Sequence, residues 1–489
     1  MATGPRILNT LTGLVEAFAP RSAPFSWYMC GPTVYDKSHL GHARTYVCFD
    51  VIRRVLRDVF RLDSTLVMGI TDVDDKIIDR ARQAGHQSIE DVSREYEDEF
   101  FRSMAALNVE PADRLMRVSE HMDEIVGFID GIQRNGFAYV NDVGDVVFDC
   151  KKFHATEGLE YGKLQPANFN APGRSSDFAL WKRSSRDEIA CWDSPWGTGR
   201  PGWHIECSAM STSAVGPDLD VHSGGIDLKF PHHNNEKAQC DAFYKSNDWA
   251  TSWWHTGHVY IDGLKMSKSL KNFITIDEFL KTSSADAFRM FCLLHRYGSG
   301  IHFTDQGVRD ADNVLNAFDN FNARLDSVIG RAVNGDHGRQ KWTVEAIALQ
   351  ERFMGARQQV VLALGDNFDT PKAMAIILDL ISNVHEHLDS NRVKCGSLLW
   401  QIRAFVNRLL QTFGLQTAPA QVSSERPWRD AVQLLVDFRQ EIRSTARSSS
   451  ATLKDILVRC DHLRATVQDQ LGVRINDGPH GKSVWTASR

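Results

Sequence analysis

The sequence lacks several features that would separate it from ordinary globular proteins. Its 489 residues contain no apolar run of about 18 residues, the length that a transmembrane helix needs, so we expect no membrane partner. It has no internal repeat and no long low-complexity tract. The hydrophobic content of 42% and the charged content of 24% fit a globular chain. At the usual size of a domain, this length predicts roughly three to four domains.

An excess of positive charge and a disulfide framework are also missing. The chain has 56 Lys and Arg against 62 Asp and Glu, a formal net charge of −6. A nucleic-acid ligand would therefore have to be met by local basic stripes. The nine cysteines are scattered and odd in number. We expect free or metal-bound thiols in a reducing compartment.

The first residues are only weakly basic. Met1–Ser22 carries Arg6 and Arg21 and a single acid, Glu16. A mitochondrial targeting peptide would be richer in Arg and Ser. The segment favours an ordinary leading strand and loop, with a transit peptide as the alternative.

Residue patterns predict a strand–loop–helix–strand unit near the N-terminus. Ser26–Cys30 is typical of a buried strand, Gly31–Asp36 of a loop, and a helix is expected from about Ala43. Leu66–Ile70 is the next expected strand. This order predicts a βαβ crossover in a parallel α/β sheet. Ligands bind at the carboxyl ends of such strands, and helix N-termini favour phosphate.

The middle of the chain interrupts this pattern. We expect an insertion that contains a strand-like segment, Asp142–Asp149, and a Gly-, Pro- and Ser-rich stretch, Pro166–Ser176. The sheet is expected to resume near Trp203–Cys207 and Leu219–His222.

The part after Lys268 is predicted to be helical. One apolar stripe has helical spacing and consists of Ala311, Val314, Leu315, Phe318, Phe321, Leu325 and Val328. Thr370 and Pro371 are typical of an N-cap and a first helical position, opening a helix through Ile381. A linker, Thr417–Pro427, precedes a more basic last region.

Two short motifs are candidates for ATP chemistry. His39-Leu40-Gly41-His42 lies where the loop enters the helix, and Lys265–Ser269 (KMSKS) follows much later. Activating a carboxylate with ATP requires charge stabilisation on the phosphates, for which histidines supply N–H donors and lysines supply positive charge. Gly41 would leave room for the nucleotide. Each motif alone has a non-catalytic alternative: the two histidines could be a chance or metal-binding pair, and the lysine motif could be a solvated turn. The presence of both motifs favours the functional interpretation.

A second candidate set is Cys30, Cys207, His232 and Glu236. His232 and Glu236 are four residues apart, which on a helix places both side chains on one face, and Pro231 suits the first turn. Two thiolates, an imidazole and a carboxylate suit zinc. Spacing alone leaves open the alternative of buried structural cysteines with a surface histidine.

Five longer stretches closely resemble cysteinyl-tRNA synthetases, a family of class I aminoacyl-tRNA synthetases. They are Cys30–His42, Ile70–Ile77, Gly202–Met210, His222–His233 and Lys265–Ile274. The similarity runs from about Ile7 to the end and is loose in the last region. It implies an α/β, Rossmann-like catalytic domain with an inserted domain, an all-α helical bundle and a small C-terminal domain. The chain looks most like the mitochondrial members, which implies the mitochondrial matrix, with the cytoplasm as the alternative.

The resemblance also implies domain boundaries. The expected parts are the first half of the nucleotide-binding fold (1–112), a connective insertion (113–199), the second half with the zinc ligands (200–250), a stem-contact region with the KMSKS motif (251–310), a helical bundle on the anticodon side (311–416) and a tRNA-contacting region (417–489).

The same resemblance implies roles for single residues. One zinc per chain, on Cys30, Cys207, His232 and Glu236, would bind the substrate thiolate and reject serine without an editing domain. The remaining expected positions are Gly31 and Thr71 for the polar groups of cysteine, Trp203 and His222 as the wall over its side chain, and Gly41, Gly225, Asp227 and Lys268 for ATP. A core aromatic is the alternative for Trp203.

The resulting expectation is a monomeric cysteine–tRNA ligase. Cysteine and Mg-ATP would form cysteinyl-adenylate, and the terminal ribose of tRNA(Cys) would then attack it. His39, His42, Lys265 and Lys268 would stabilise the transition state. The alternatives are a ligase that joins cysteine to an aminosugar, which needs no long helical region, and a non-catalytic zinc-containing RNA-binding protein.

A basic stripe is expected near the C-terminus. Asp430–Ala446 has a helical pattern, beside which Arg439, Arg443 and Arg447 recur every four residues. A solvated helix face is the alternative. Our hypothesis is that these arginines contact tRNA phosphates.

Overall fold

The computed structural model describes most of the chain. The described residues are 4–86, 88–165, 177–185, 188–268, 270–333, 342–390, 395–416, 436, 461, 464–465, 468, 473–477 and 483–487. They form two compact units: the first comprises Met1–Val308 and Ala363–Pro371, and the second comprises Arg309–Leu362 and Lys372–Arg489. Among the described residues, no helix combines the length and the apolar character needed to cross a bilayer.

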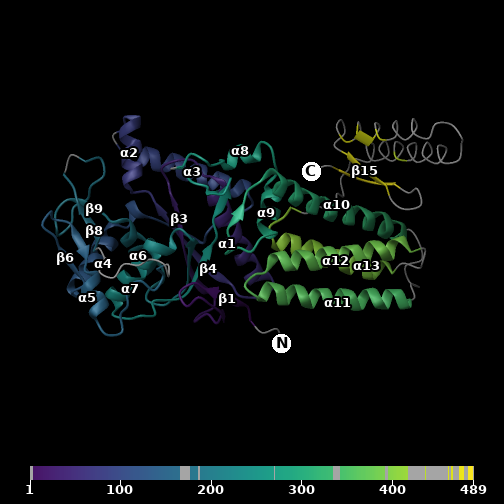
Figure 1. Cartoon of the computed structure of the whole chain (residues 1–489), viewed down its shortest axis with the longest axis horizontal. Helices are drawn as coiled ribbons and strands as arrows, with labels where there is room; N and C mark the ends of the chain where they lie inside the picture. The colour runs from purple at the N-terminus through teal and green to yellow at the C-terminus, as the bar shows by residue number, and fades with distance from the viewer. Residues whose placement is uncertain are drawn as a thin grey trace. The chain divides into compact units, whose positions relative to one another are not determined.

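A five-stranded parallel sheet organises the first unit (Figure 1). Its strand order is β11 (Ala250–Thr256), β10 (Leu219–Gly225), β3 (Phe25–Thr33), β4 (Ser64–Thr71) and β5 (Arg114–Arg117). All four pairings are parallel, and helix α1 (Leu40–Asp58) connects β3 to β4. The central strands are almost wholly buried, as expected for a parallel sheet covered on both faces. The predicted βαβ crossover is confirmed.

Three local predictions are wrong. Gly31–Thr33 continues strand β3 instead of forming a loop, because it pairs with the end of β4. Helix α1 begins at Leu40 rather than near Ala43, because the His39 side chain caps it. Trp203–Cys207 is the start of helix α6 (Trp203–Val215), not a strand. A run of five residues is too short for its period to separate strand from helix.

A smaller antiparallel sheet lies almost entirely within the expected insertion. Its strands are β6 (Ala138–Val140), β7 (Val146–Phe148), β8 (Phe178–Arg183) and β9 (Gly199–Pro201). Strand β7 lies in the segment predicted to be strand-like, whereas Pro166–Ser176 lies outside the described residues. Strand β5 falls within the span expected for the insertion, but it is the edge of the parallel sheet.

The remaining elements of the first unit are a hairpin, a small sheet and further helices. A hairpin of β1 (Arg6–Asn9) and β2 (Leu14–Ala17) confirms the leading strand. A three-stranded sheet has the order β13 (Leu264–Lys265), β12 (Val259–Ile261), β14 (Ile301–His302). The other helices are α2 (Asp75–Ala84), α3 (Glu90–Ala106), α4 (Met122–Arg134), α5 (Cys150–Ala155), α7 (Asn234–Tyr244), α8 (Ile276–Leu280) and α9 (Ala285–Leu293).

The described part of the second unit is mainly helical, as predicted. It contains most of α10 (Asp305–Val333) and α11 (Val344–Gly365), together with α12 (Thr370–Asp389), α13 (Gly396–Thr412) and a hairpin of β15 (Val473–Asp477) and β16 (Ser483–Ala487). The predicted stripe on α10 supplies five core residues, which are Ala311, Leu315, Phe318, Phe321 and Leu325. The predicted linker Thr417–Pro427 and the arginines of the basic stripe lie outside the described residues.

A buried ion pair joins α1 to α9 in the first unit. Arg289 is 0% exposed and donates to the carboxylate of Asp50, which is 4% exposed. Asp50 also accepts from Nε of Arg54 at 2.9 Å and from the N–H of Glu110 at 2.8 Å. One carboxylate therefore satisfies donors from three segments of the chain.

We expect Asp50→Asn to lower the free energy of unfolding of the first unit by on the order of 3 kcal/mol, because it leaves the Arg289 guanidinium buried without a counter-charge. Urea unfolding followed by tryptophan fluorescence measures this. The matched control is Asp218→Asn, whose partner Arg21 is on the surface; it should cost less than about 1 kcal/mol. Equal effects of the two substitutions would contradict the assignment.

Candidate active site and metal centre

Four side chains that are distant in the sequence meet inside the first unit. Cys30 lies on β3, Cys207 on α6, His232 in the turn η2 (Lys229–His233) and Glu236 in the first turn of α7. One potential ligand atom from each lies within 4.8 Å of all the others, and all four residues are buried. Because His232 is 1% exposed, the alternative of a surface histidine is wrong.

The cluster has the spacing and the chemistry of a tetrahedral zinc site. Sγ of Cys30 lies 3.7 Å from Sγ of Cys207, 3.7 Å from Nε2 of His232 and 3.6 Å from Oε1 of Glu236. Zinc–sulfur bonds of about 2.3 Å place two sulfur ligands of a tetrahedron about 3.8 Å apart. Burial, followed by the hydrogen bond with Cys207, raises the pKa of the Cys30 thiol. A cation among these donors would counter that effect, so the donor set fits zinc.

Two histidines orient the cluster from outside. Nδ1 of His204 lies 2.9 Å from Nδ1 of His232. If Nε2 of His232 is a ligand, its Nδ1–H must donate to His204, which fixes both tautomers. Burial lowers the pKa of both imidazoles, that of His204 to about 4, so both are neutral. Nε2 of His222 lies 2.9 Å from Oε2 of Glu236, the oxygen that does not face His232.

A second, overlapping set also has one potential ligand atom from each residue within 4.8 Å of all the others. It consists of Cys30, His222, His233 and Glu236. This overlapping set has one sulfur where the first has two, and zinc binds thiolate readily. The first set is therefore the better zinc site, and His222 is better understood as a partner of Glu236.

Tyr28 is a neighbour of the cluster that the sequence patterns did not single out. It lies two residues before Cys30 on β3, so both side chains are on the same face. Burial, followed by the negative groups at Cys207 and Cys30, raises the pKa of the Tyr28 phenol. Tyr28 is therefore an O–H donor at neutral pH. A side chain at Gly69 on β4 would collide with it, since an added Cβ would lie 2.2 Å from the hydroxyl oxygen.

Trp203, Gly31 and Thr71 are expected to surround the substrate cysteine, and the structure places each of them separately. The Trp203 ring stacks on the His232 ring with centroids 4.4 Å apart, and Trp203 is 37% exposed, so the core-aromatic alternative is wrong. Gly31 follows Cys30, and an added Cβ there would lie 2.2 Å from the carbonyl oxygen of Gly69. Thr71 is buried at the carboxyl end of β4.

The first motif caps helix α1. Nδ1 of His39 accepts from the N–H groups of Gly41 at 3.1 Å and His42 at 3.4 Å, which leaves its proton on Nε2. Burial lowers the pKa of His39 to about 4 and that of His42 well below its ordinary value, so both are neutral N–H donors. Their rings stack with centroids 3.9 Å apart. An added Cβ at Gly41 would lie 2.8 Å from Cε1 of His39, so this imidazole itself requires the glycine.

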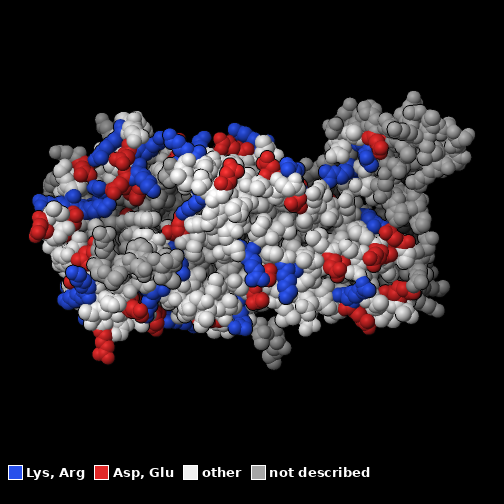
Figure 2. Space-filling model, in the orientation of Figure 1, with Lys and Arg blue, Asp and Glu red and all other residues white. Residues whose placement is uncertain are grey.

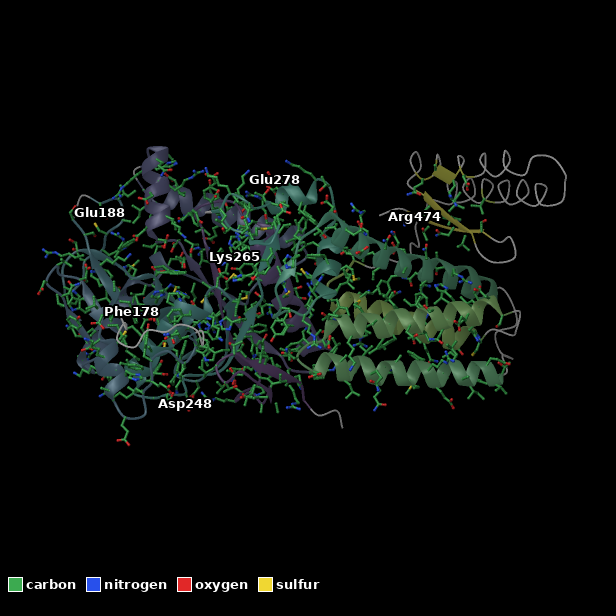
Figure 3. All side chains as sticks on the ribbon, in the orientation of Figure 1. Phe178, Glu188, Asp248, Lys265, Glu278 and Arg474 are labelled. Carbon is green, nitrogen blue, oxygen red and sulfur yellow. The ribbon has the colours of Figure 1, made fainter. Side chains whose placement is uncertain are left out.

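The two lysines of the second motif lie beside acidic residues and a tyrosine. Nζ of Lys265, labelled in Figure 3, lies 3.5 Å from Oδ2 of Asp227. Nζ of Lys268 donates to the carbonyl of Asp36 at 3.1 Å and lies 4.4 Å from the centre of the Tyr35 ring. Burial lowers the pKa of Lys268 to about 8. Tyr35 and Asp36 were not assigned a role from the sequence, although they lie within one of the stretches that resemble the family.

Backbone hydrogen bonds bring the two motifs together. The N–H of Leu40 donates to the carbonyl of Ile274 at 3.0 Å, and the N–H of Ile276 donates to the carbonyl of Ser38 at 3.1 Å. The chain that follows the second motif therefore runs along the N-terminus of α1. Gly225 ends β10, and an added Cβ there would lie 2.5 Å from Oδ1 of Asp227. These groups lie at the carboxyl-end edge of the sheet, where α/β folds bind ligands.

Comparisons with known proteins agree with this arrangement. Residues 19–313 match the family model "tRNA synthetases class I (C) catalytic domain". The chain is 38% identical to the cytoplasmic cysteine–tRNA ligase of Dictyostelium discoideum over 98% of this chain and 77% of the relative. It is also 38% identical to a probable mitochondrial cysteine–tRNA ligase of Xenopus tropicalis, over 91% of this chain and 79% of the relative.

Among solved structures, the fold is similar to that of Mycobacterium tuberculosis methionyl-tRNA synthetase in complex with methionyl-adenylate. The TM-score is 0.63 at 16% sequence identity, over 80% of this chain and 92% of that one. At this identity the likeness concerns the fold alone. The predicted class I catalytic fold followed by a helical region is confirmed.

Proposed function

This chain belongs to the cysteine–tRNA ligase family of class I synthetases, and from that premise we propose how its residues carry out the reaction. The activity is the ATP-dependent joining of L-cysteine to tRNA(Cys). The observation that supports our assignment of residues is the meeting of Cys30 and Cys207, with sulfurs 3.7 Å apart, in the unit that holds both ATP motifs. Cysteine-dependent ATP–pyrophosphate exchange, with serine as the control, tests the first step. Charging of cytosolic and mitochondrial tRNA side by side tests the second.

One zinc ion per chain binds to Cys30, Cys207, His232 and Glu236. When bound, zinc would supply a borderline-soft Lewis acid for the thiolate of the substrate. His204 and His222 hold His232 and Glu236 in orientation. Trp203 and His222 form the wall over the cysteine side chain, and Gly31 and Thr71 hold its polar groups.

ATP, with its Mg²⁺, binds at the N-terminus of α1. Gly41, Gly225, Asp227 and Lys268 contact the nucleotide. The neutral imidazoles of His39 and His42 donate from Nε2, and Lys265 and Lys268 supply positive charge as pyrophosphate leaves. Because Lys268 lies on Tyr35 and Asp36 in the structure, it has to exchange these partners for phosphate oxygens.

The proposed domains are those expected from the resemblance, namely 1–112, 113–199, 200–250, 251–310, 311–416 and 417–489, in a monomer. Strand β5, at the start of the proposed insertion, nevertheless belongs to the parallel sheet. Figure 2 shows Lys and Arg interspersed with Asp and Glu on the visible face, without a continuous basic patch over its described residues. The tRNA contacts are proposed in 417–489 because this is the region that the resemblance assigns to tRNA. The matched relatives include cytoplasmic and mitochondrial ligases; we keep the mitochondrial matrix as the proposed location.

Purified protein is expected to carry about one zinc per chain. Cys207→Ser should lose the metal and cysteine-dependent exchange together, because a serine hydroxyl is a poor zinc ligand. Metal analysis and exchange assays on the same sample measure this. Cys292→Ser, also at a buried cysteine but outside the cluster, is the matched control and should keep its zinc. Full zinc and normal activity in Cys207→Ser would overturn the ligand set.

Lys268→Ala is expected to lower kcat for activation far more than it weakens ATP binding. Loss of one electrostatic contact made in the transition state is worth on the order of 3 kcal/mol. Steady-state exchange kinetics with varied ATP separate the two effects. A variant with only a raised KM for ATP would contradict this role.

The pKa of Lys268 gives the same prediction a pH dependence. Its amine is charged below about pH 8 and neutral above it, so kcat/KM for ATP should fall as the pH rises through that value. Lys268→Arg stays charged and should remove this part of the decline. An identical pH profile in both proteins would show that Lys268 does not titrate in this range.

Replacing Arg439, Arg443 and Arg447 with glutamine should weaken tRNA binding and flatten its salt dependence, because each phosphate contact releases counterions. Filter binding at several salt concentrations measures both. Pyrophosphate exchange needs no tRNA and should be unchanged. If affinity and salt slope stay as in the parent protein, the stripe is only a solvated surface.

A further inference from the structure

Arg44, two residues after the first motif, is buried and bonded to backbone carbonyls. It is 1% exposed. Its terminal nitrogens donate to the carbonyl oxygens of His258 at 2.7 Å, Arg296 at 3.2 Å, Tyr297 at 3.3 Å and Ser299. A buried guanidinium requires acceptors, and its planar fork can bridge several at once. One side chain of α1 therefore holds two separate backbone segments.

These segments lead into the three-stranded sheet that carries Lys265. His258 immediately precedes β12, which pairs with β13 through Tyr260 and Lys265. Ser299 precedes β14, which pairs with the other edge of β12. The segments are in close contact, since an added Cβ at Gly257 would lie 2.1 Å from the Ser299 carbonyl oxygen. A displacement of this junction would move Lys265 relative to α1.

The geometry points to Arg44 as a positioning residue that sets the placement of Lys265 relative to the histidines of the first motif. His42 and Arg44 both lie in the first two turns of α1. The hydrogen bonds from Arg44 to the backbone carbonyls therefore fix the position of the three-stranded sheet relative to the helix that carries His42. This inference rests on the proposed role of Lys265 in activation. Misplacement of a catalytic group by about 1 Å can cost on the order of 100-fold in rate.

A double-mutant cycle tests this role. Arg44→Lys keeps the charge but loses the fork, and it should lower kcat for pyrophosphate exchange by about tenfold or more. The KM for cysteine should stay within about twofold, since the metal cluster is not touched. In the Lys265→Ala background, Arg44→Lys should have little further effect, because there is no longer a lysine to position.

Arg289→Lys is the matched control. Arg289 is also buried and donates to the backbone carbonyls of Leu107 and Asn108 and to Asp50, and these three residues lie outside the sheet that carries Lys265. Its effect should multiply with that of Lys265→Ala. If Arg44→Lys does not fold, as judged by zinc content and thermal unfolding, Gly257→Ala perturbs the same junction and should show the same non-additivity.

The outcomes are distinguishable. Losses that multiply in the Arg44 and Lys265 double variant, or normal exchange by Arg44→Lys, overturn the positioning role and leave the proposed function intact. Normal exchange by Lys265→Ala removes the proposed role of Lys265, and the inference about Arg44 falls with it.

Discussion

The parallel pairing of β10, β3 and β4 determines where the candidate groups at the ends of these strands lie. In a parallel sheet all strands end at the same edge, so residues at the ends of different strands meet there. β3 carries Cys30 near its end and leads into the His39 cap of α1, and β10 ends at Gly225. Two of the closest approaches at this edge are possible only with glycine, at Gly31 and Gly69. A change in strand register would therefore displace Cys30 and the His39 cap of α1 together.

Burial gives the site its second property, which is a set of neutral imidazoles. His39, His42, His204 and His232 all have pKa values lowered by burial. A neutral imidazole offers one N–H and one lone pair, so each hydrogen bond at one nitrogen decides the role of the other. At His39 the helix N–H groups occupy Nδ1, and at His232 the partner His204 does so. The same rule thus leaves an N–H donor on Nε2 of His39 and, if His232 binds a metal, a lone pair on its Nε2.

Elements that are marked by several residues at a defined spacing were predictable from the sequence. The type of element formed by a short run of residues was harder to predict. The βαβ crossover, the apolar stripe on α10 and the position of His39–His42 at the start of a helix could be predicted because each has several residues at a defined spacing. Trp203–Cys207 was assigned to the wrong type of element because five residues satisfy either period. The positions of Cys30 and Cys207 in the sequence could not predict that the two side chains meet, since their approach depends on the long-range packing of α6 against the sheet. Tyr28 had a usable signal, its i, i+2 relation to Cys30, whereas the carbonyl partners of Arg44 have none, because backbone acceptors exist at every residue.

On the proposed function, discrimination between cysteine and serine would follow from the donor set rather than from shape. The two amino acids have nearly the same size, and the O–H of Tyr28 or an N–H of a neighbouring histidine could bond to either side chain. A pocket that relies on shape rejects such an analogue only weakly. On the proposed function, a cluster with two sulfur donors favours a soft third sulfur over a hard oxygen. The two substrates then differ at the single atom that would bind the metal, so the hydrogen bonds of His204 and His222 to the cluster would matter more than the fit of the Trp203 ring.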